Sequence, residues 1–112
     1  MDIQQLEAIG IDYEEGIQRF AGKANLYEKY LVKFLEDTNF YGLEQALKVK
    51  DYEQAYMYAH TLKGVAGNLS MNTFHQSLIT FVDYLRHHNL EAIEAEFPNI
   101  QQQYQKITEA LI

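Results

Sequence analysis

Apolar residues recur along almost the whole chain at intervals of three and four, the spacing of one face of an α-helix. In residues 51–70 the intervals are 3, 4, 3, 4 and 3, and the apolar positions are Tyr52, Ala55, Ala59, Leu62, Ala66 and Leu69. No segment alternates apolar and polar residues with the period of two that a half-buried strand requires. The pattern therefore predicts an all-α protein.

Helix boundaries are marked by short polar residues, whose side chains can accept a hydrogen bond from the first turn of a helix. Such starts are expected at Asp12, Asn25, Asp51 and Asn89. Gly22 would end the first helix, and Pro98 should break or kink the last one because proline lacks an amide hydrogen. The predicted helices cover residues 12–21, 25–38, 39–48, 51–69, 72–88 and 89–111, with a tight turn at 68–72.

The connections between these helices are short, which favours a bundle of antiparallel helices. The helices 51–69 and 72–88 should form its central hairpin. With 112 residues, of which 47% are hydrophobic, the chain is expected to fold as one domain over residues 1–112. A coiled-coil dimer is disfavoured because the helices are short and capped, so a monomer is the simplest expectation.

The charge and composition exclude several classes of function. Nine Lys and Arg residues against sixteen Asp and Glu residues give a net charge of −7, which disfavours binding to nucleic acid phosphates. No cysteine is present, so disulfides and thiolate metal sites are excluded. The sequence has no apolar run of about 18 residues and no signal-peptide pattern at its N-terminus, so no membrane association is expected. These features favour a cytoplasmic protein.

One histidine stands in an unusual helical setting, in the sequence AHTLKGVAGNLS of residues 59–70. Helical geometry points His60 roughly 130° away from the centre of the apolar stripe, toward solvent. Gly64 and Gly67 are each unfavourable in a helix by about 1 kcal/mol relative to alanine. Because helical side chains lean toward the N-terminus, a side chain at position 64 would cover His60. We expect both glycines to clear this face and to leave His60 approachable, with Lys63 beside it.

An approachable imidazole suggests nucleophilic chemistry. The unperturbed pKa of histidine is about 6.5, so a neutral ring can attack a phosphoryl group near pH 7 and hold it as an N-phosphate. Lys63 would then offset the charge of the phosphoryl oxygens. Two structural explanations compete with this one. A surface histidine often has no function, and small residues can permit close helix packing, although Gly64 and Gly67 point away from the apolar stripe.

The remaining candidate residues carry weaker signals. His75 is expected to lie at the surface or half-buried, and His87 and His88 suit the negative end of a helix dipole. The sequence lacks the His pairs spaced by four residues that favour a metal site, so none is predicted. Met57 and Met71 are expected near the surface beside His60, where methionine suits an adaptable docking surface.

The motif Ala59–Gly64, continued by Ala66 and Leu69, resembles the A-H-x-L-K-G-x-(A/S)-x-x-L signature of histidine-containing phosphotransfer (HPt) domains. The upstream segments 10–16 and 30–35 also resemble the opening helices of bacterial members. The resemblance implies an antiparallel four-helix bundle core with additional short N-terminal helices. One departure is Ser70, where many members have glycine, which leaves the geometry of that turn open.

The resemblance also implies a function. His60 would accept a phosphoryl group from the aspartate of a receiver (response-regulator) domain and pass it to another receiver. Lys63 would be the charge partner and Gly64 the residue that gives steric clearance. The receiver would hold the Mg²⁺, so this chain would need no cofactor. A polar residue on the following helix often orients the histidine in this family, and Gln76 and Asp83 are candidates.

Several alternatives remain open. The chain has no Gly-rich phosphate loop and no room for an ATP-binding domain, so a phosphocarrier is expected rather than an enzyme. It would be a free-standing protein that serves receivers and a hybrid sensor kinase, or a phosphorylatable domain excised from a hybrid or chemotaxis-type kinase. A non-phosphorylated helical adaptor is a further alternative. A hydrolase or metalloprotein ranks last, because the sequence shows no group of convergent polar residues.

Overall fold

The computed structural model describes residues 1–112, and its regular structure is helical throughout. The predicted all-α class is therefore confirmed. The helices are α1 (Ile3–Ala8), α2 (Tyr13–Arg19), α3 (Ala24–Lys33), the short 3₁₀-helix η1 (Phe34–Glu36), α4 (Asn39–Lys48), α5 (Tyr52–Asn68), α6 (Asn72–Arg86) and α7 (Leu90–Leu111).

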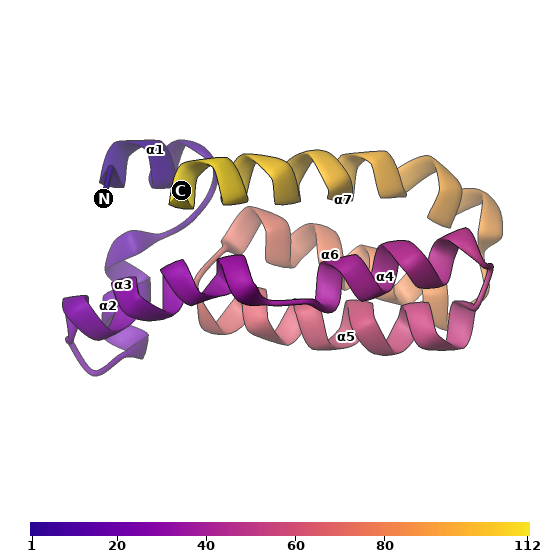
Figure 1. Cartoon of the computed structure of the whole chain (residues 1–112), viewed down its shortest axis with the longest axis horizontal. Helices are drawn as coiled ribbons and strands as arrows, with labels where there is room; N and C mark the ends of the chain where they lie inside the picture. The colour runs from indigo at the N-terminus through magenta and orange to yellow at the C-terminus, as the bar shows by residue number, and fades with distance from the viewer.

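The four helices α4–α7 form an antiparallel bundle, and the short helices α1 and α2 lie with α3 at one end of it (Figure 1). The packing of α5 against α6 and α4 is the most extensive in the molecule, and α7 lies against α6. The predicted central hairpin of α5 and α6 is thus present. The molecule measures 40 × 22 × 21 Å, and its two termini lie at the same end as α1.

A single apolar core runs through the bundle and continues under the N-terminal helices. Its largest fully buried side chains include Tyr27 from α3, Phe34 from η1, and Phe74 and Phe81 from α6. Burying one such side chain stabilises the fold by roughly 1.5–3 kcal/mol. The alanines of the α5 stripe are also fully buried. Their small side chains let neighbouring helices come close to α5.

Most of the predicted helix starts are correct. The side chains of Asp12, Asp51 and Asn89 each accept a hydrogen bond from the backbone amide three residues on. The predicted cap at Asn25 is wrong, because α3 begins one residue earlier, after Lys23, and has no side-chain cap.

One predicted helix end and one predicted helix break also differ from the structure. The helix expected to reach residue 38 changes to the tighter η1 after Lys33, and Asp37 is extended. The expected break at Pro98 is absent, since α7 continues through it. A proline inside a helix is unfavourable by about 3 kcal/mol. Burial of Ile93, Ile100 and Ile107 on the same stripe offsets this cost and holds the helix together.

The turn between α5 and α6 is fixed by the N-terminal helices. Ser70 adopts a left-handed conformation with φ of 56°, which many HPt domains would reach with glycine. The Ser70 carbonyl accepts a hydrogen bond from the Asp12 amide at 2.9 Å, and its hydroxyl donates to Glu15 Oε1 at 2.9 Å. The buried Tyr27 hydroxyl donates to the Leu69 carbonyl at 2.8 Å. The end of α5 is therefore held in place from two sides.

Candidate functional site

His60 lies on the solvent-exposed face of α5. The neighbouring Ala59 and Leu62 are fully buried on the opposite face, and His60 itself is exposed. Lys63 is half-buried, one turn further along the same helix. The positions predicted from helical spacing are therefore correct, because the apolar stripe fixes the rotation of α5 in the bundle.

Gly64 leaves open space beside His60. A Cβ atom built at Gly64 would have no heavy atom within 4 Å, apart from its own helix backbone and chain neighbours. Any group that approaches His60 from this side meets no side chain at position 64. The unoccupied space predicted at position 64 is therefore present.

Gly67 has a different role from the one predicted. A Cβ atom there would lie 2.9 Å from Cε1 of His75, which is closer than packed atoms allow. The His75 Nδ1 atom lies 2.9 Å from the Lys63 carbonyl oxygen, and since a carbonyl only accepts, this nitrogen carries the hydrogen. The prediction that Gly67 clears the exposed face is wrong. Gly67 lies on the flank of α5 that faces α6, where it makes room for the half-buried His75 ring.

The His60 ring is in contact with Tyr56, one turn earlier on α5. The two ring centroids are 5.8 Å apart, and the rings are tilted by 39°. The guanidinium of Arg86, from the last turn of α6, lies 5.8 Å from the centroid of the Tyr56 ring. Its Nη2 atom donates to the Tyr56 hydroxyl at 3.4 Å, and this hydrogen bond raises the pKa of Arg86. Tyr56 shares the helix face of His60 in the sequence, whereas no local pattern pointed to Arg86.

The two polar residues considered for orienting the imidazole make no hydrogen bond with it. Gln76 is exposed on α6. The Asp83 carboxylate lies 3.6 Å from Arg86 Nη1 and 3.4 Å from His87 Nδ1. Asp83 therefore contacts Arg86 and His87 rather than the His60 imidazole.

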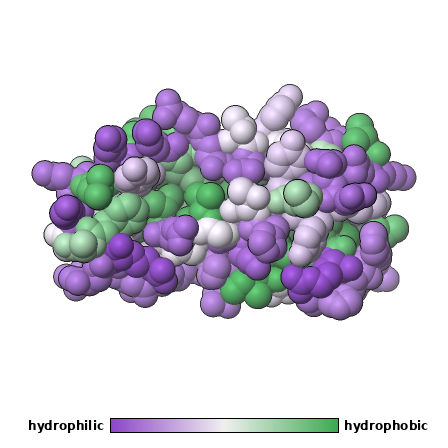
Figure 2. Space-filling model, turned by 90° about the horizontal axis from the view of Figure 1, so that it is seen from below, coloured by the Kyte–Doolittle hydropathy of each residue, from purple (hydrophilic) through white to green (hydrophobic).

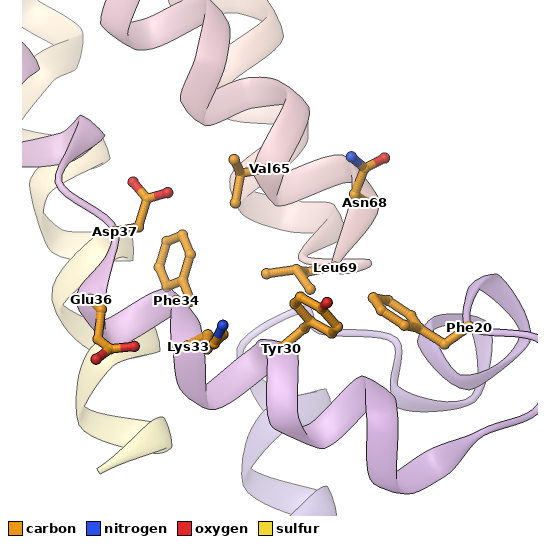
Figure 3. A pocket seen from close by; sticks show the side chains of 9 residues that line it. All are labelled: Phe20, Tyr30, Lys33, Phe34, Glu36, Asp37, Val65, Asn68 and Leu69. Carbon is orange, nitrogen blue, oxygen red and sulfur yellow. The ribbon is translucent and has the colours of Figure 1, made fainter.

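An apolar groove of about 460 Å³ lies beside the C-terminal half of α5. Tyr30 and Phe20 stand next to Leu69, and Val65 lies above Phe34 on the other side (Figure 3). Figure 2 views the molecule from the side of α5 and shows apolar atoms gathered over the end where α2 and α3 lie. From α5 the groove is lined by Val65, Asn68 and Leu69, so it lies along the turns of this helix that follow Gly64.

The two methionines expected near the site differ in exposure. Met57 is 59% exposed on α5, three residues before His60, as predicted. Met71 is completely buried, so its assignment to a docking surface is wrong. The reason is the turn after α5, where Met71 forms an isolated bridge with Ile11 and points into the core.

Other kinds of site find no support in the geometry. No three His, Cys, Asp or Glu side chains come together in a group that could hold a metal ion. None of the helices combines the length and apolar character needed to cross a lipid bilayer.

The comparison with protein families decides the classification. The family model described as "Hpt domain" matches residues 30–110, which is most of the chain. The chain belongs to the HPt domain family. HPt domains carry phosphoryl groups on histidine in phosphorelays, interact with receiver domains, and are phosphocarrier modules rather than kinases. The matched region of this HPt domain includes α4–α7 and His60, whereas α1, α2 and most of α3 precede it. A comparison with curated proteins and one with solved structures both give no match.

Proposed function

We propose that His60 is the phosphoacceptor of this HPt domain, which takes a phosphoryl group from a receiver aspartate and passes it to a second receiver. The observation that carries the proposal is the exposed imidazole on α5 with no side chain on the next turn at Gly64. His75 is half-buried against the Lys63 carbonyl, so its ring is less accessible. His60 is also the histidine of the motif that resembles the family signature.

The reaction needs few groups from this chain. The lone pair of a ring nitrogen of His60 attacks the phosphorus of the receiver's aspartyl phosphate. The P–N bond forms as the P–O bond to the aspartate breaks, and the bonding electrons stay on the carboxylate oxygen. The other ring nitrogen keeps its proton. The reverse reaction with a second receiver regenerates the free imidazole.

Positioning and charge are the contributions that His60 and Lys63 would make. Catalysis of phosphoryl transfer rests mainly on alignment of the reacting groups and on stabilisation of the oxygen charges. The partner receiver would supply the Mg²⁺, and Lys63, one turn from His60, would add a positive charge. The groove beyond Gly64 offers the receiver an apolar contact area beside the reacting histidine.

Transfer of labelled phosphate tests the proposal. A panel of receiver domains, including those of hybrid sensor kinases, is phosphorylated with labelled acetyl phosphate and mixed with the protein. We expect acid-labile, base-stable label on the wild type and on a His88→Gln control, and none on His60→Gln. Equal labelling of His60→Gln would show that another histidine is the acceptor.

A second outcome separates the carrier from an adaptor. If no receiver transfers label but one binds the wild type and His60→Gln equally well, the protein acts as a non-phosphorylated adaptor. Binding of unphosphorylated receivers to both proteins is therefore measured by calorimetry in parallel.

A further inference from the structure

We propose that Arg86, held in place by Tyr56, is a second cation of the phosphorylation site and stabilises the phosphoryl group on His60 together with Lys63. The inference rests on the proposed function of His60. It assigns direct binding of the phosphoryl group to a residue of α6 that lies outside the family-like motif of α5.

The first argument is the direction of the His60 side chain. Side chains on a helix lean toward its N-terminus, so the imidazole leans over the turn that contains Tyr56. The centroid separation of 5.8 Å between the two rings agrees with this direction. A phosphoryl group on the ring would therefore extend on the Tyr56 side of the site. Lys63 would reach it from the following turn, since its side chain leans the same way.

The second argument is the position of Arg86. Because α6 runs antiparallel to α5, its last turn lies beside the first half of α5. The Arg86 side chain leans toward the N-terminus of α6, which is the direction of His60. Its guanidinium rests on Tyr56, the same ring that contacts the imidazole. Arg86 is therefore one aromatic side chain away from the reacting group.

The third argument is that the present contacts of Arg86 are weak enough to be exchanged. The hydrogen bond to the Tyr56 hydroxyl is 3.4 Å long, beyond the usual range for strong hydrogen bonds. The Arg86 side chain is 51% exposed, and the ion pair with Asp83 has a separation of 3.6 Å. A phosphoryl oxygen is a stronger, charged acceptor for guanidinium than a hydroxyl. Arg86 would move from the Tyr56 hydroxyl to the phosphoryl group when His60 is phosphorylated.

Asp83 should oppose this effect. Its carboxylate competes for Arg86 and brings a negative charge to the same side of the site. Removing the charge of Arg86 and removing that of Asp83 should therefore have opposite effects on the stability of phosphorylated His60. Loss of Arg86 should weaken phosphohistidine, and loss of the Asp83 charge should strengthen it.

The measurement is the equilibrium of phosphoryl exchange between one receiver and this protein. We expect Arg86→Gln to shift it toward the receiver by about two- to fivefold, the range for exposed ion pairs. Asp83→Asn should shift it the other way. Arg86→Lys should recover most of the wild-type value, and added salt should reduce every shift. Lys106→Gln, which makes the same charge change on the exposed surface of α7, serves as the control.

The outcomes distinguish this inference from the proposed function. A labelled wild type with an unchanged equilibrium in Arg86→Gln would overturn the role of Arg86 alone. Shifts of the same sign in Arg86→Gln and Asp83→Asn would also overturn it, because they would indicate altered folding rather than charge. A wild type that takes no label on His60 would overturn both.

Discussion

Replacing Gly64 and Gly67 by alanine, one at a time, should change the stability of the protein in opposite directions. Alanine is favoured over glycine in a helix interior by about 1 kcal/mol. At position 64 the new methyl group meets nothing within 4 Å, so Gly64→Ala should gain the full amount. At position 67 the methyl group would lie 2.9 Å from the His75 ring, and the ring would have to turn away.

Movement of the His75 ring breaks its hydrogen bond to the Lys63 carbonyl, at a cost of about 1 kcal/mol. A strained rotamer for the displaced ring adds about 1 kcal/mol. Together these losses exceed the gain in helix propensity, so Gly67→Ala should lower the free energy of unfolding by about 1 kcal/mol. The two variants should therefore differ by about 2 kcal/mol, although both make the same change in the same helix.

Urea unfolding followed by far-ultraviolet circular dichroism gives the free energies directly. In thermal unfolding the two variants should differ by about 8 °C for a domain of this size. The double variant Gly67→Ala/His75→Ala should recover the stability lost in Gly67→Ala. Equal stabilisation by both single alanines would refute the reasoning, since the His75 ring would then not be wedged against Gly67. Label transfer to Gly64→Ala should also slow, because the methyl group enters the space that a receiver needs.

Three further predictions concern stability, acid sensitivity and partner binding. The hydrogen bond from Ser70 lowers the pKa of Glu15 below its unfolded value of 4.5. The ionised Glu15 therefore stabilises the fold fully above pH 4.5. This stabilisation is lost as the pH falls through the lower pKa of the folded state. Glu15→Gln should be less stable than the wild type at neutral pH, and urea unfolding in acid should show this difference vanish. Pro98→Ala should raise the free energy of unfolding by about 1–3 kcal/mol, and a lower melting temperature would contradict the offset that we assign to packing. Tyr30→Ala should weaken receiver binding by about 1 kcal/mol without changing the sites of labelling, and unchanged affinity in calorimetry would remove the groove from the interface.

The sequence carried most of the information on the fold because the decisive signals are local. The stripe from Tyr52 to Leu69 sets the rotation of α5, and with it the exposure of His60. The caps at Asp51 and Asn89 need only the residues of their own first turn. The boundaries of α4 and the α5–α6 hairpin follow from the same kind of signal.

The parts of the site that were missed depend on contacts between helices. Arg86 lies thirty positions after Tyr56 in the sequence, on another helix. The spacing of residues within one helix cannot predict such a contact. The prediction for Gly67 is wrong for the same reason, since only the position of α6 shows that the His75 ring packs against Gly67. Met71 follows the turn after α5, and its backbone pairing with Ile11, which is far away in the sequence, decides that it is buried.

The hydrogen bonds at Ser70 and Leu69 have a consequence for where this domain can be cut. Their partners Asp12, Glu15 and Tyr27 all precede residue 30, where the match to the family begins. A fragment trimmed to the matched residues would keep His60, Lys63 and Arg86, but it would lose the groups that anchor the end of α5. The residues that match the family, 30–110, are therefore fewer than the residues needed to hold α5 in place. Sequence changes in the first 29 residues can alter the presentation of His60 without touching any part of the family motif.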